Sequence, residues 1–134
     1  MRTLYVVTIV LMLAAVVALA QVDPEYQGWM KSNAANMGSL NKNIAAKDGA
    51  AAASDAMKLE ETFKQVGDYW KKKGGADDAV KFAMNAQMAA AAAAKAASGG
   101  NLDEAQAQAK SLQGNCGGCH MAHRAGAQGN FSFK

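Results

Sequence analysis

Residues 54–110 read SDAMKLEETFKQVGDYWKKKGGADDAVKFAMNAQMAAAAAAKAASGGNLDEAQAQAK, and this stretch decides the fold because it contains two helix ends and two helix starts. The first break is Gly74-Gly75, which follows a segment rich in good helix formers. The second is Ser98-Gly99-Gly100, which ends a run dominated by alanine. Because both breaks are short, the helices on either side must turn back on one another. The stretch therefore predicts three neighbouring helices joined by tight turns.

The helical pattern continues on both sides of this stretch. Asp23 as N-cap and Pro24 at the first helical position open an earlier helix. Asn101, with Glu104 three residues later, forms a capping box at the start of the last helix. We expect an all-α fold, an antiparallel up-down-up-down four-helix bundle. The expected helices span residues 24–47, 54–73, 76–98 and 101–127.

Apolar side chains recur at helical spacing along each segment and mark the faces that we expect in the core. The expected buried positions are Tyr26, Met30, Met37, Leu40 and Ile44 in the first helix, Leu59, Phe63, Val66 and Trp70 in the second, and Val80, Met84, Met88 and Ala91 in the third.

Composition limits the class of protein. The chain has 134 residues, 51% of them hydrophobic and 19% charged, with two cysteines and a formal net charge of +3. This length suits one domain and excludes a multidomain enzyme. The charge is small and scattered, so the sequence gives no support for nucleic-acid binding. Two cysteines are too few for a disulfide-stapled scaffold.

The first twenty residues read as a secretory signal peptide. Arg2 precedes an apolar run from Leu4 to Leu19, and the segment ends in the small-residue pattern that signal peptidases cleave, before Gln21. We therefore expect residues 1–20 to be removed and residues 21–134 to form a soluble periplasmic domain. An uncleaved membrane anchor is the alternative, although the apolar run is short for a span.

Cys116-Gly117-Gly118-Cys119-His120 carries the chemistry of the chain. The C-x-x-C-H spacing is the attachment signature of a c-type haem. Residues three apart on a helix share a face, so Cys116 and Cys119 can each form a thioether with one haem vinyl group. His120 then places an imidazole nitrogen on the iron. The two glycines remove side chains where the porphyrin edge must approach the backbone.

Other functions of the same residues have to be weighed. A thioredoxin-like redox pair requires a βαβ setting, which a helical chain lacks, and a structural disulfide leaves His120 unexplained. Zinc is the stronger rival, because Cys116, Cys119, His120 and His123 are four ligand types within eight residues. Four ligands in two helical turns surround one ion poorly, however, and the sequence favours haem.

The sixth iron ligand can be predicted from distances along the helix axes. In an antiparallel bundle, the end of the last helix lies beside the start of the first. At 1.5 Å per residue, His120 is about 10 Å from a helix end near Ala127, and Met30 is about 9 Å from a start at Pro24. The Met30 thioether is therefore the predicted distal ligand. Met37 lies about 10 Å further along and is expected to be a core residue.

Further side chains lie at a similar distance along the helix axes and are therefore expected at the haem end of the bundle. Arg124 lies one turn beyond His120, where its guanidinium can pair with a haem propionate or compensate the helix end. Met84 is the one wall residue that competes with Met30 as a ligand. Trp70 is an expected haem contact, with ordinary core packing as its alternative. The full set of candidate walls is Trp29, Val66, Tyr69, Trp70, Val80 and Met84.

Two stretches together resemble the class II cytochromes c, the family of cytochrome c-prime and the low-spin cytochromes c-556. One is the C-x-x-C-H-x-x-x-R run from Cys116 to Arg124, and the other joins Trp29-Met30-Lys31 to Asn36-Met37-Gly38. The resemblance implies a periplasmic four-helix bundle with one covalent haem c, often a homodimer. It also implies that Cys116 and Cys119 carry the thioethers and His120 the iron, with Arg124 nearby and Met30 in the distal position.

Two features depart from the family pattern. His123 stands where many members carry an aromatic residue just before the basic one, and the connection between the second and third helices is unusually short. The first departure affects the pocket on the His120 side of the haem. The second affects the surface through which members of the family usually dimerise.

We accordingly expect a one-electron carrier that exchanges electrons with larger redox proteins, and not an enzyme. A His/Met ligand pair raises the reduction potential and closes the sixth position to small molecules. Two alternatives stay open. One is a five-coordinate protein that binds NO or CO, and the other is a helical module stabilised by zinc or a disulfide, with no redox role.

Overall fold

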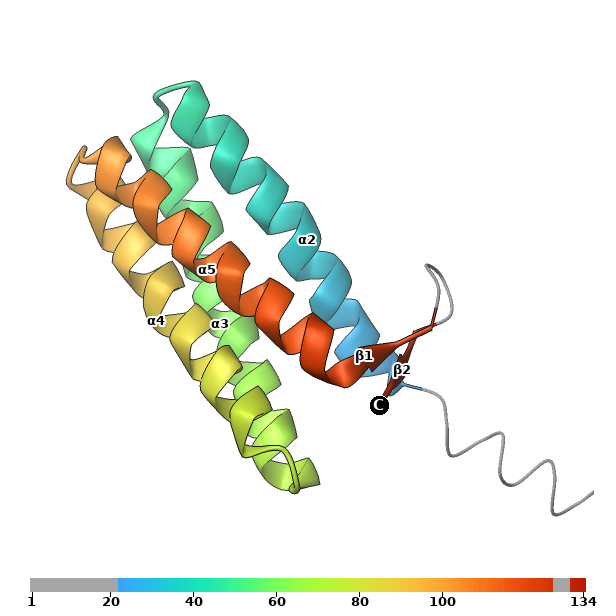
Figure 1. Cartoon of the computed structure of the whole chain (residues 1–134). Coiled ribbons are helices and arrows are strands. Elements are labelled where there is room, and N and C mark those ends of the chain that lie inside the picture. Colours follow the sequence, from blue (N-terminus) through green and yellow to red (C-terminus); the bar gives the residue numbers. More distant parts are fainter. Residues whose placement is uncertain (1–21, 127–130) are drawn as a thin grey trace, which may run out of the picture.

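A computed structural model describes residues 22–126 and 131–134, which form four long helices and two short strands. Consecutive helices run in opposite directions and pack side by side, as the sequence predicted (Figure 1). The expected signal peptide, residues 1–20, lies outside the described residues. Within the described ranges, no helix is both long and apolar enough to span a bilayer. The helices are α2 (Pro24–Ala45), α3 (Gly49–Lys73), α4 (Asp77–Ser98) and α5 (Leu102–His123).

Side-chain caps fix three of the helix starts. The Asp23 carboxylate accepts a hydrogen bond from the backbone N–H of Glu25 at 2.8 Å. Asn101 Oδ1 accepts from the N–H of Glu104 at 3.1 Å, which confirms the cap predicted for the last helix. Both caps satisfy N–H groups that have no partner inside the helix.

The start of α3 differs from the prediction. The sequence placed it near Ser54, whereas the helix begins at Gly49, directly after Asp48, whose carboxylate accepts from the N–H of Ala51 at 2.9 Å. Gly49 is required there by a close approach, because a Cβ at this position would lie 2.8 Å from the carbonyl oxygen of Ala97. The Asp48-Gly49 pair is thus a helix start and not part of a longer loop.

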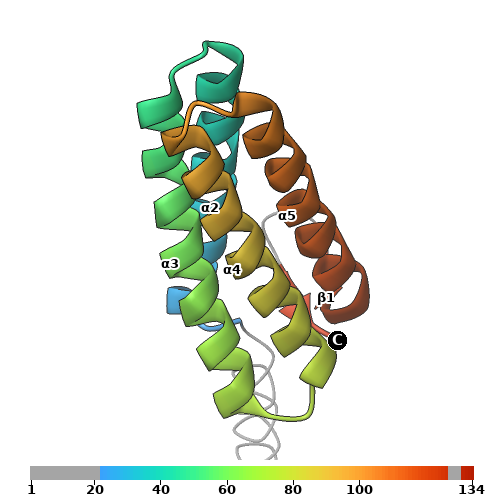
Figure 2. The same ribbon diagram turned by 90° about the vertical axis from the view of Figure 1, so that its left-hand side faces the viewer.

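The buried face of α4 is also different from the predicted one. Met84 is 45% exposed and Met88 is 60% exposed, and Val80 is only half-buried. Alanines spaced three or four residues apart take the core positions instead, and α3 packs closely along them. Small side chains let two helices approach, and α3 and α4 run side by side along their length (Figure 2). The buried alanines of α4 are Ala79, Ala83, Ala86, Ala89, Ala90, Ala93, Ala94 and Ala97.

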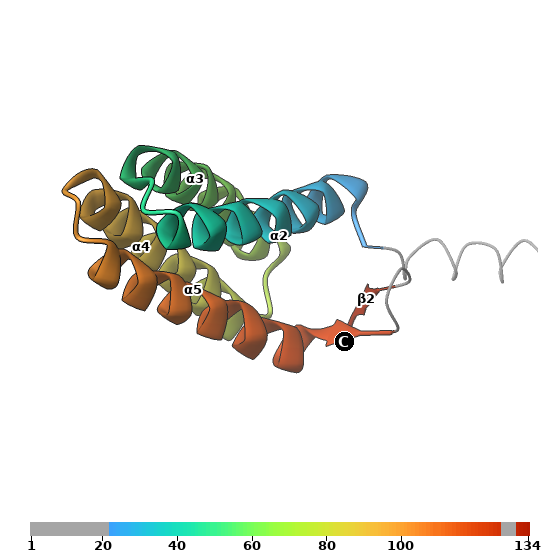
Figure 3. The same cartoon turned by 90° about the horizontal axis from the view of Figure 1, so that it is seen from above.

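The C-terminal end is not helical where the sequence predicted helix. α5 ends at His123, and β1 (Arg124–Ala125) pairs antiparallel with β2 (Ser132–Phe133). Figure 3 shows this pair of strands at the end of the bundle where α2 begins. The Phe133 ring there packs on Tyr26, Tyr69 and Trp70, with centroids 4.9–6.1 Å apart. Burial of this aromatic ring supplies a reason for the chain to turn back.

Candidate functional site

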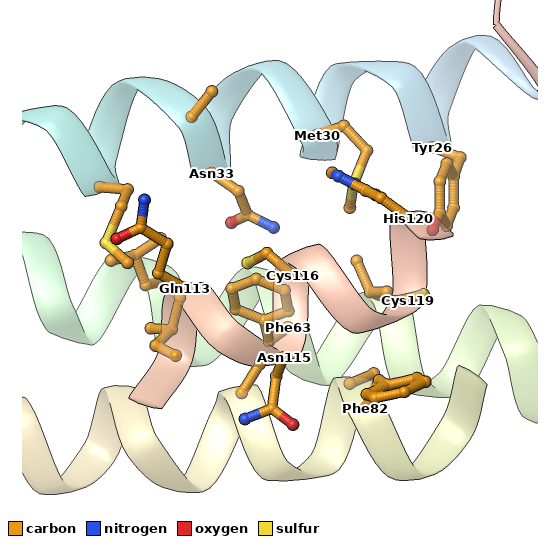
Figure 4. A pocket seen from close by; sticks show the side chains of 17 residues that line it. Tyr26, Met30, Asn33, Phe63, Phe82, Gln113, Asn115, Cys116, Cys119 and His120 are labelled. Carbon is orange, nitrogen blue, oxygen red and sulfur yellow. The ribbon is translucent and has the colours of Figure 1, made fainter. Parts of the chain in front are cut away.

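A cavity of about 240 Å³ lies between the four helices, and most of the predicted haem-binding residues line it (Figure 4). Four of the sequence-predicted site residues line it: Met30 from α2, and Cys116, Cys119 and His120 from α5. The cavity is also lined by Tyr26, Asn33, Ala34, Met37, Leu59, Phe63, Val66, Phe82, Ala83, Ala86, Leu112, Gln113 and Asn115.

The lining is mostly apolar and carries no charged side chain among the described residues: none of those that surround the cavity is Lys, Arg, Asp or Glu. A cavity of this size and lining is therefore best explained as the site of an apolar ligand.

Cys116 and Cys119 are free, half-buried thiols on the side of α5 that faces the cavity. Burial raises the pKa of Cys116 to about 11, and the nearby Cys119 adds to the rise. Burial likewise raises the pKa of Cys119 to about 11, with a smaller contribution from Asp78. Both groups are therefore neutral thiols at neutral pH and are poor nucleophiles for ordinary thiolate chemistry. This environment does not suit a thioredoxin-like redox pair.

His120 follows the second thiol directly and also faces the cavity. Burial lowers the pKa of its imidazole, and the positive charge of Arg124 lowers it further. A lowered pKa keeps the ring neutral at physiological pH, and the neutral ring has a lone pair for a metal ion. The residue is thus prepared for coordination by its surroundings as well as by its position in the motif.

Met30 and Met37 are the two thioethers in the cavity wall, and both are half-buried on α2. Met37 lies two helical turns beyond Met30, about 10 Å along the axis. Figure 4 shows Met30 at the same end of the cavity as His120 and Tyr26. Met84, the competing ligand in the sequence analysis, is absent from the lining. The structure therefore brings Met30 and His120 to one end of one cavity.

Asn33 is a cavity residue that the sequence analysis missed. Its side chain is 6% exposed and lines the cavity, yet neither its Nδ2 nor its Oδ1 has a hydrogen-bond partner within the described residues. An unsatisfied buried polar group costs about 1–3 kcal/mol. A signal was present, since Asn33 falls between Met30 and Met37 in the apolar stripe of the first helix. A polar residue within such a stripe indicates a partner in the site.

Gly118 and Gly117 have different surroundings, although both lie between the two cysteines. A Cβ on Gly118 would lie 2.6 Å from the Phe82 ring, so an alanine there requires this half-buried ring to move. A Cβ on Gly117 would meet nothing within 4 Å. The packing of Phe82, another cavity residue that the sequence analysis missed, depends directly on the motif.

Trp70 and Arg124 lie outside the cavity lining. Trp70 is buried behind Tyr26, and its Nε1–H donates to the Tyr26 hydroxyl at 3.1 Å. Arg124 is exposed, and its guanidinium lies over the Phe131 ring, 4.3 Å from the centroid. Of the other predicted walls only Val66 lines the cavity, while Trp29, Tyr69 and Val80 do not. Trp70 thus acts on the cavity through Tyr26, and its role as a haem contact remains a prediction, like that of Arg124.

His123 does not join the other ligand types of the motif. Its Nε2 lies 2.9 Å from a carboxylate oxygen of Asp78, and its ring packs on Trp70 at 5.3 Å. No group of three or more His, Cys, Asp or Glu side chains is arranged to hold a metal ion in the part of the chain that the structure describes. The zinc alternative therefore gains no geometric support.

Comparisons with known proteins add no relative to this picture: no protein-family model, no curated protein and no solved structure matches the chain. The functional assignment consequently depends on the motif and on the cavity around it.

Proposed function

We propose that the chain is an exported monohaem c-type cytochrome that carries single electrons between redox proteins. The observation that supports the proposal most strongly is the convergence of Cys116, Cys119, His120 and Met30 on one apolar cavity. Two thiols three residues apart, an adjoining neutral imidazole and a thioether are the donor set of a covalently attached haem with His/Met ligation.

The cavity also suits the group in its other properties. Its walls are mostly apolar and carry no charged side chain among the described residues, so they suit the apolar ring of a haem. Cys116 and Cys119 would hold the haem c through thioether bonds, and His120 and Met30 would ligate the iron. The bound haem supplies one redox centre that alternates between ferric and ferrous iron. A soft thioether ligand favours the ferrous state and raises the reduction potential.

Export supports the same function. The apolar leader at residues 1–20 predicts delivery to the periplasm, which is an oxidising compartment. In such a compartment, two thiols three residues apart form a disulfide unless another bond occupies them. Thioether attachment explains why the chain keeps both cysteines next to a histidine.

Absorption spectra of the purified protein in both oxidation states test the ligand set. We expect a low-spin spectrum with a methionine-to-iron band in the ferric state and slow or absent CO binding in the ferrous state. Met30→Ala should remove that band and convert the protein to a high-spin form. Met37→Ala is the matched control and should keep the low-spin spectrum. A Met30→Ala protein that stays low-spin would show that another residue holds the sixth position.

The five-coordinate alternative makes the opposite spectroscopic prediction. It requires a high-spin spectrum and rapid CO uptake by the unsubstituted ferrous protein. The same pair of spectra therefore separates an electron carrier from a gas-binding protein.

A further inference from the structure

The amide of Asn33 is a buried polar group without a hydrogen-bond partner in the described structure. Neither Nδ2 nor Oδ1 is bonded, and the residue is more than nine-tenths buried. Buried amides are nearly always hydrogen-bonded in proteins. Because Asn33 lines the cavity, its partner is to be sought among the groups that meet there when the site is filled.

Other asparagines of the bundle do have partners within the chain. Asn43 Nδ2 donates to Asp55 Oδ2 at 2.8 Å, and Asn36 Nδ2, one turn beyond Asn33 on α2, donates to Ser32 Oγ at 3.2 Å. Asn33 differs from them in being both buried and unpaired.

The donor end of the Asn33 amide faces the part of the cavity that holds Met30. Side chains on an α-helix lean towards its N-terminus, over the preceding turn. Met30 belongs to that turn, three residues earlier on the same face, whereas Met37 lies one turn in the other direction. Figure 4 shows Nδ2 of Asn33 on the side of Met30 and Oδ1 on the opposite side, towards Gln113.

The cavity lining offers Asn33 no oxygen acceptor. Apart from Asn33 itself, the lining residues with side-chain oxygen are Tyr26, Gln113 and Asn115, and none of them bonds Asn33. The proposed ligand set, by contrast, fixes the sulfur of Met30 on the iron beside this amide. A thioether sulfur has two lone pairs, so the sulfur that gives one to the iron keeps the other as an acceptor.

We propose that Asn33 Nδ2 donates a hydrogen bond to the iron-bound sulfur of Met30 and so keeps this thioether on the iron. The inference rests on the proposed function, since it requires a haem with His120 and Met30 as ligands. It makes Asn33 a positioning residue, which acts on the iron through Met30. Retention matters most in the ferric state, for which a soft thioether is the weaker ligand.

Nuclear magnetic resonance of the ¹⁵N-labelled, haem-loaded ferric protein tests the bond directly. A hydrogen bond to the sulfur carries unpaired spin density from the iron to one Nδ2 proton. This contact shift adds to the through-space shift, which the backbone amides calibrate. We expect the added shift on one Nδ2 proton of Asn33 and none on the Asn36 amide, which does not line the cavity. A merely structural role for Asn33 would not produce it.

Met37→Ala identifies the acceptor in the same measurement. Met37 is the other thioether of the cavity wall, and its removal should leave the added shift unchanged. Met30→Ala should abolish it, because the bonded sulfur is then absent.

Substitution of Asn33 should weaken the attachment of Met30. The measurement is the loss of the methionine-to-iron band on warming the ferric protein, at temperatures where circular dichroism shows the helices intact. We expect Asn33→Leu and Asn33→Ala to raise the equilibrium constant for detachment about 2- to 10-fold, the effect of one hydrogen bond. Leucine keeps the volume of asparagine, and alanine removes the amide without adding atoms. Asn36→Leu is the matched control and should leave the constant unchanged.

Two results overturn the inference while the proposed function stands. One is a set of Asn33 Nδ2 shifts that the through-space contribution explains in full. The other is a detachment constant that is the same for the Asn33 variants as for the Asn36→Leu control. Failure of the proposed function is a different observation, namely a purified chain without covalent haem, or a loaded chain without a methionine-to-iron band.

Discussion

The two halves of the bundle are packed in opposite ways. Where α3 begins and α4 ends, alanines face the neighbouring helix, and the backbones approach until a Cβ on Gly49 would lie 2.8 Å from the oxygen of Ala97. In the other half, the larger side chains of Met30, Phe63 and Phe82 surround a cavity of about 240 Å³. The comparison teaches that a hollow site is compatible with a stable bundle when the close contacts are concentrated elsewhere.

The four helices also have different roles. The α3–α4 pair forms a closely packed frame, while α2 and α5 bring Met30, Asn33 and the Cys116–His120 motif to the cavity from its two sides. The frame uses small residues, and the site uses sulfur, imidazole and amide groups.

Overpacking should separate the two halves most clearly. Ala90 is fully buried in the alanine face, so Ala90→Leu should lower the free energy of unfolding by about 3 kcal/mol. Ala86 lies one turn away and lines the cavity, where a larger side chain has room. Ala86→Leu should therefore cost less than half as much in a haem-free chain with both cysteines replaced by serine. Urea unfolding measures both values, and equal losses would contradict the contrast.

The two glycines of the motif form a matched pair within one helical turn. Gly118→Ala places a Cβ against Phe82 and should lower the free energy of unfolding by about 2 kcal/mol. Gly117→Ala points into open space and should raise it by up to about 1 kcal/mol, because alanine has the higher helix propensity. Thermal unfolding of the variants in a haem-free chain, with both cysteines replaced by serine, is the measurement. Similar effects at the two positions would show that Phe82 does not pack as described.

The hydrogen bond between Trp70 and Tyr26 should have a smaller effect. Tyr26→Phe leaves the buried Trp70 Nε1–H without its acceptor and should cost about 1 kcal/mol. Tyr69→Phe is the control, because Tyr69 belongs to the same group of packed rings and is only half-buried. Guanidinium unfolding of both variants checks the prediction, which is wrong if the control loses as much stability as Tyr26→Phe.

Alkaline pH should distinguish free thiols from attached ones. Burial raises the folded-state pKa of Cys116 and Cys119 from 9.0 to about 11. A raised folded-state pKa gives stability that is present below pH 9 and is lost as the pH rises towards 11. The chain without haem, with its thiols intact, should therefore lose stability across this window.

The haem-loaded protein is the control for this measurement, because thioether sulfur has no proton to lose. Burial raises the pKa of Tyr26 to about 12, and because Cys119 and Cys116 add to that rise, part of this effect also belongs to the thiols. For each form, the change in unfolding midpoint between pH 8 and pH 10.5 is measured. The difference between the two changes gives the contribution of the thiols. Equal pH dependence in the two forms would mean that the thiols remain free in the loaded protein.

Much of the fold could be predicted from local signals. Asp23 and Asn101 act as caps where the sequence placed them, and the glycine pairs end α3 and α4 as expected. These features depend on a few neighbouring residues, so the sequence contains them directly. Met30 and His120 line one cavity, as the antiparallel arrangement suggested, although the distance argument assumed a helix end near Ala127 and α5 ends at His123.

The failures depend on contacts between segments. Hydropathy placed Met84 and Met88 in the core, yet the close approach of α3 admits only alanine on that face of α4. The end of α5 at His123 and the strand that follows it pair with the segment that carries Phe133, and such a pairing between segments is not encoded by local propensity. Asn33 was overlooked because an apolar pattern tolerates one polar residue, although this residue is the buried polar side chain of the α2 wall.

The central claim is that this cavity holds a haem bound through the sulfur atoms of Cys116 and Cys119. The most direct test is to produce the chain in a periplasm with c-type cytochrome maturation, denature it, and measure the haem that remains attached per polypeptide. The account predicts one covalent haem per chain, and none in a Cys116→Ser, Cys119→Ser variant. A denatured wild-type chain that is colourless, or that releases its pigment into acidified organic solvent, would contradict it.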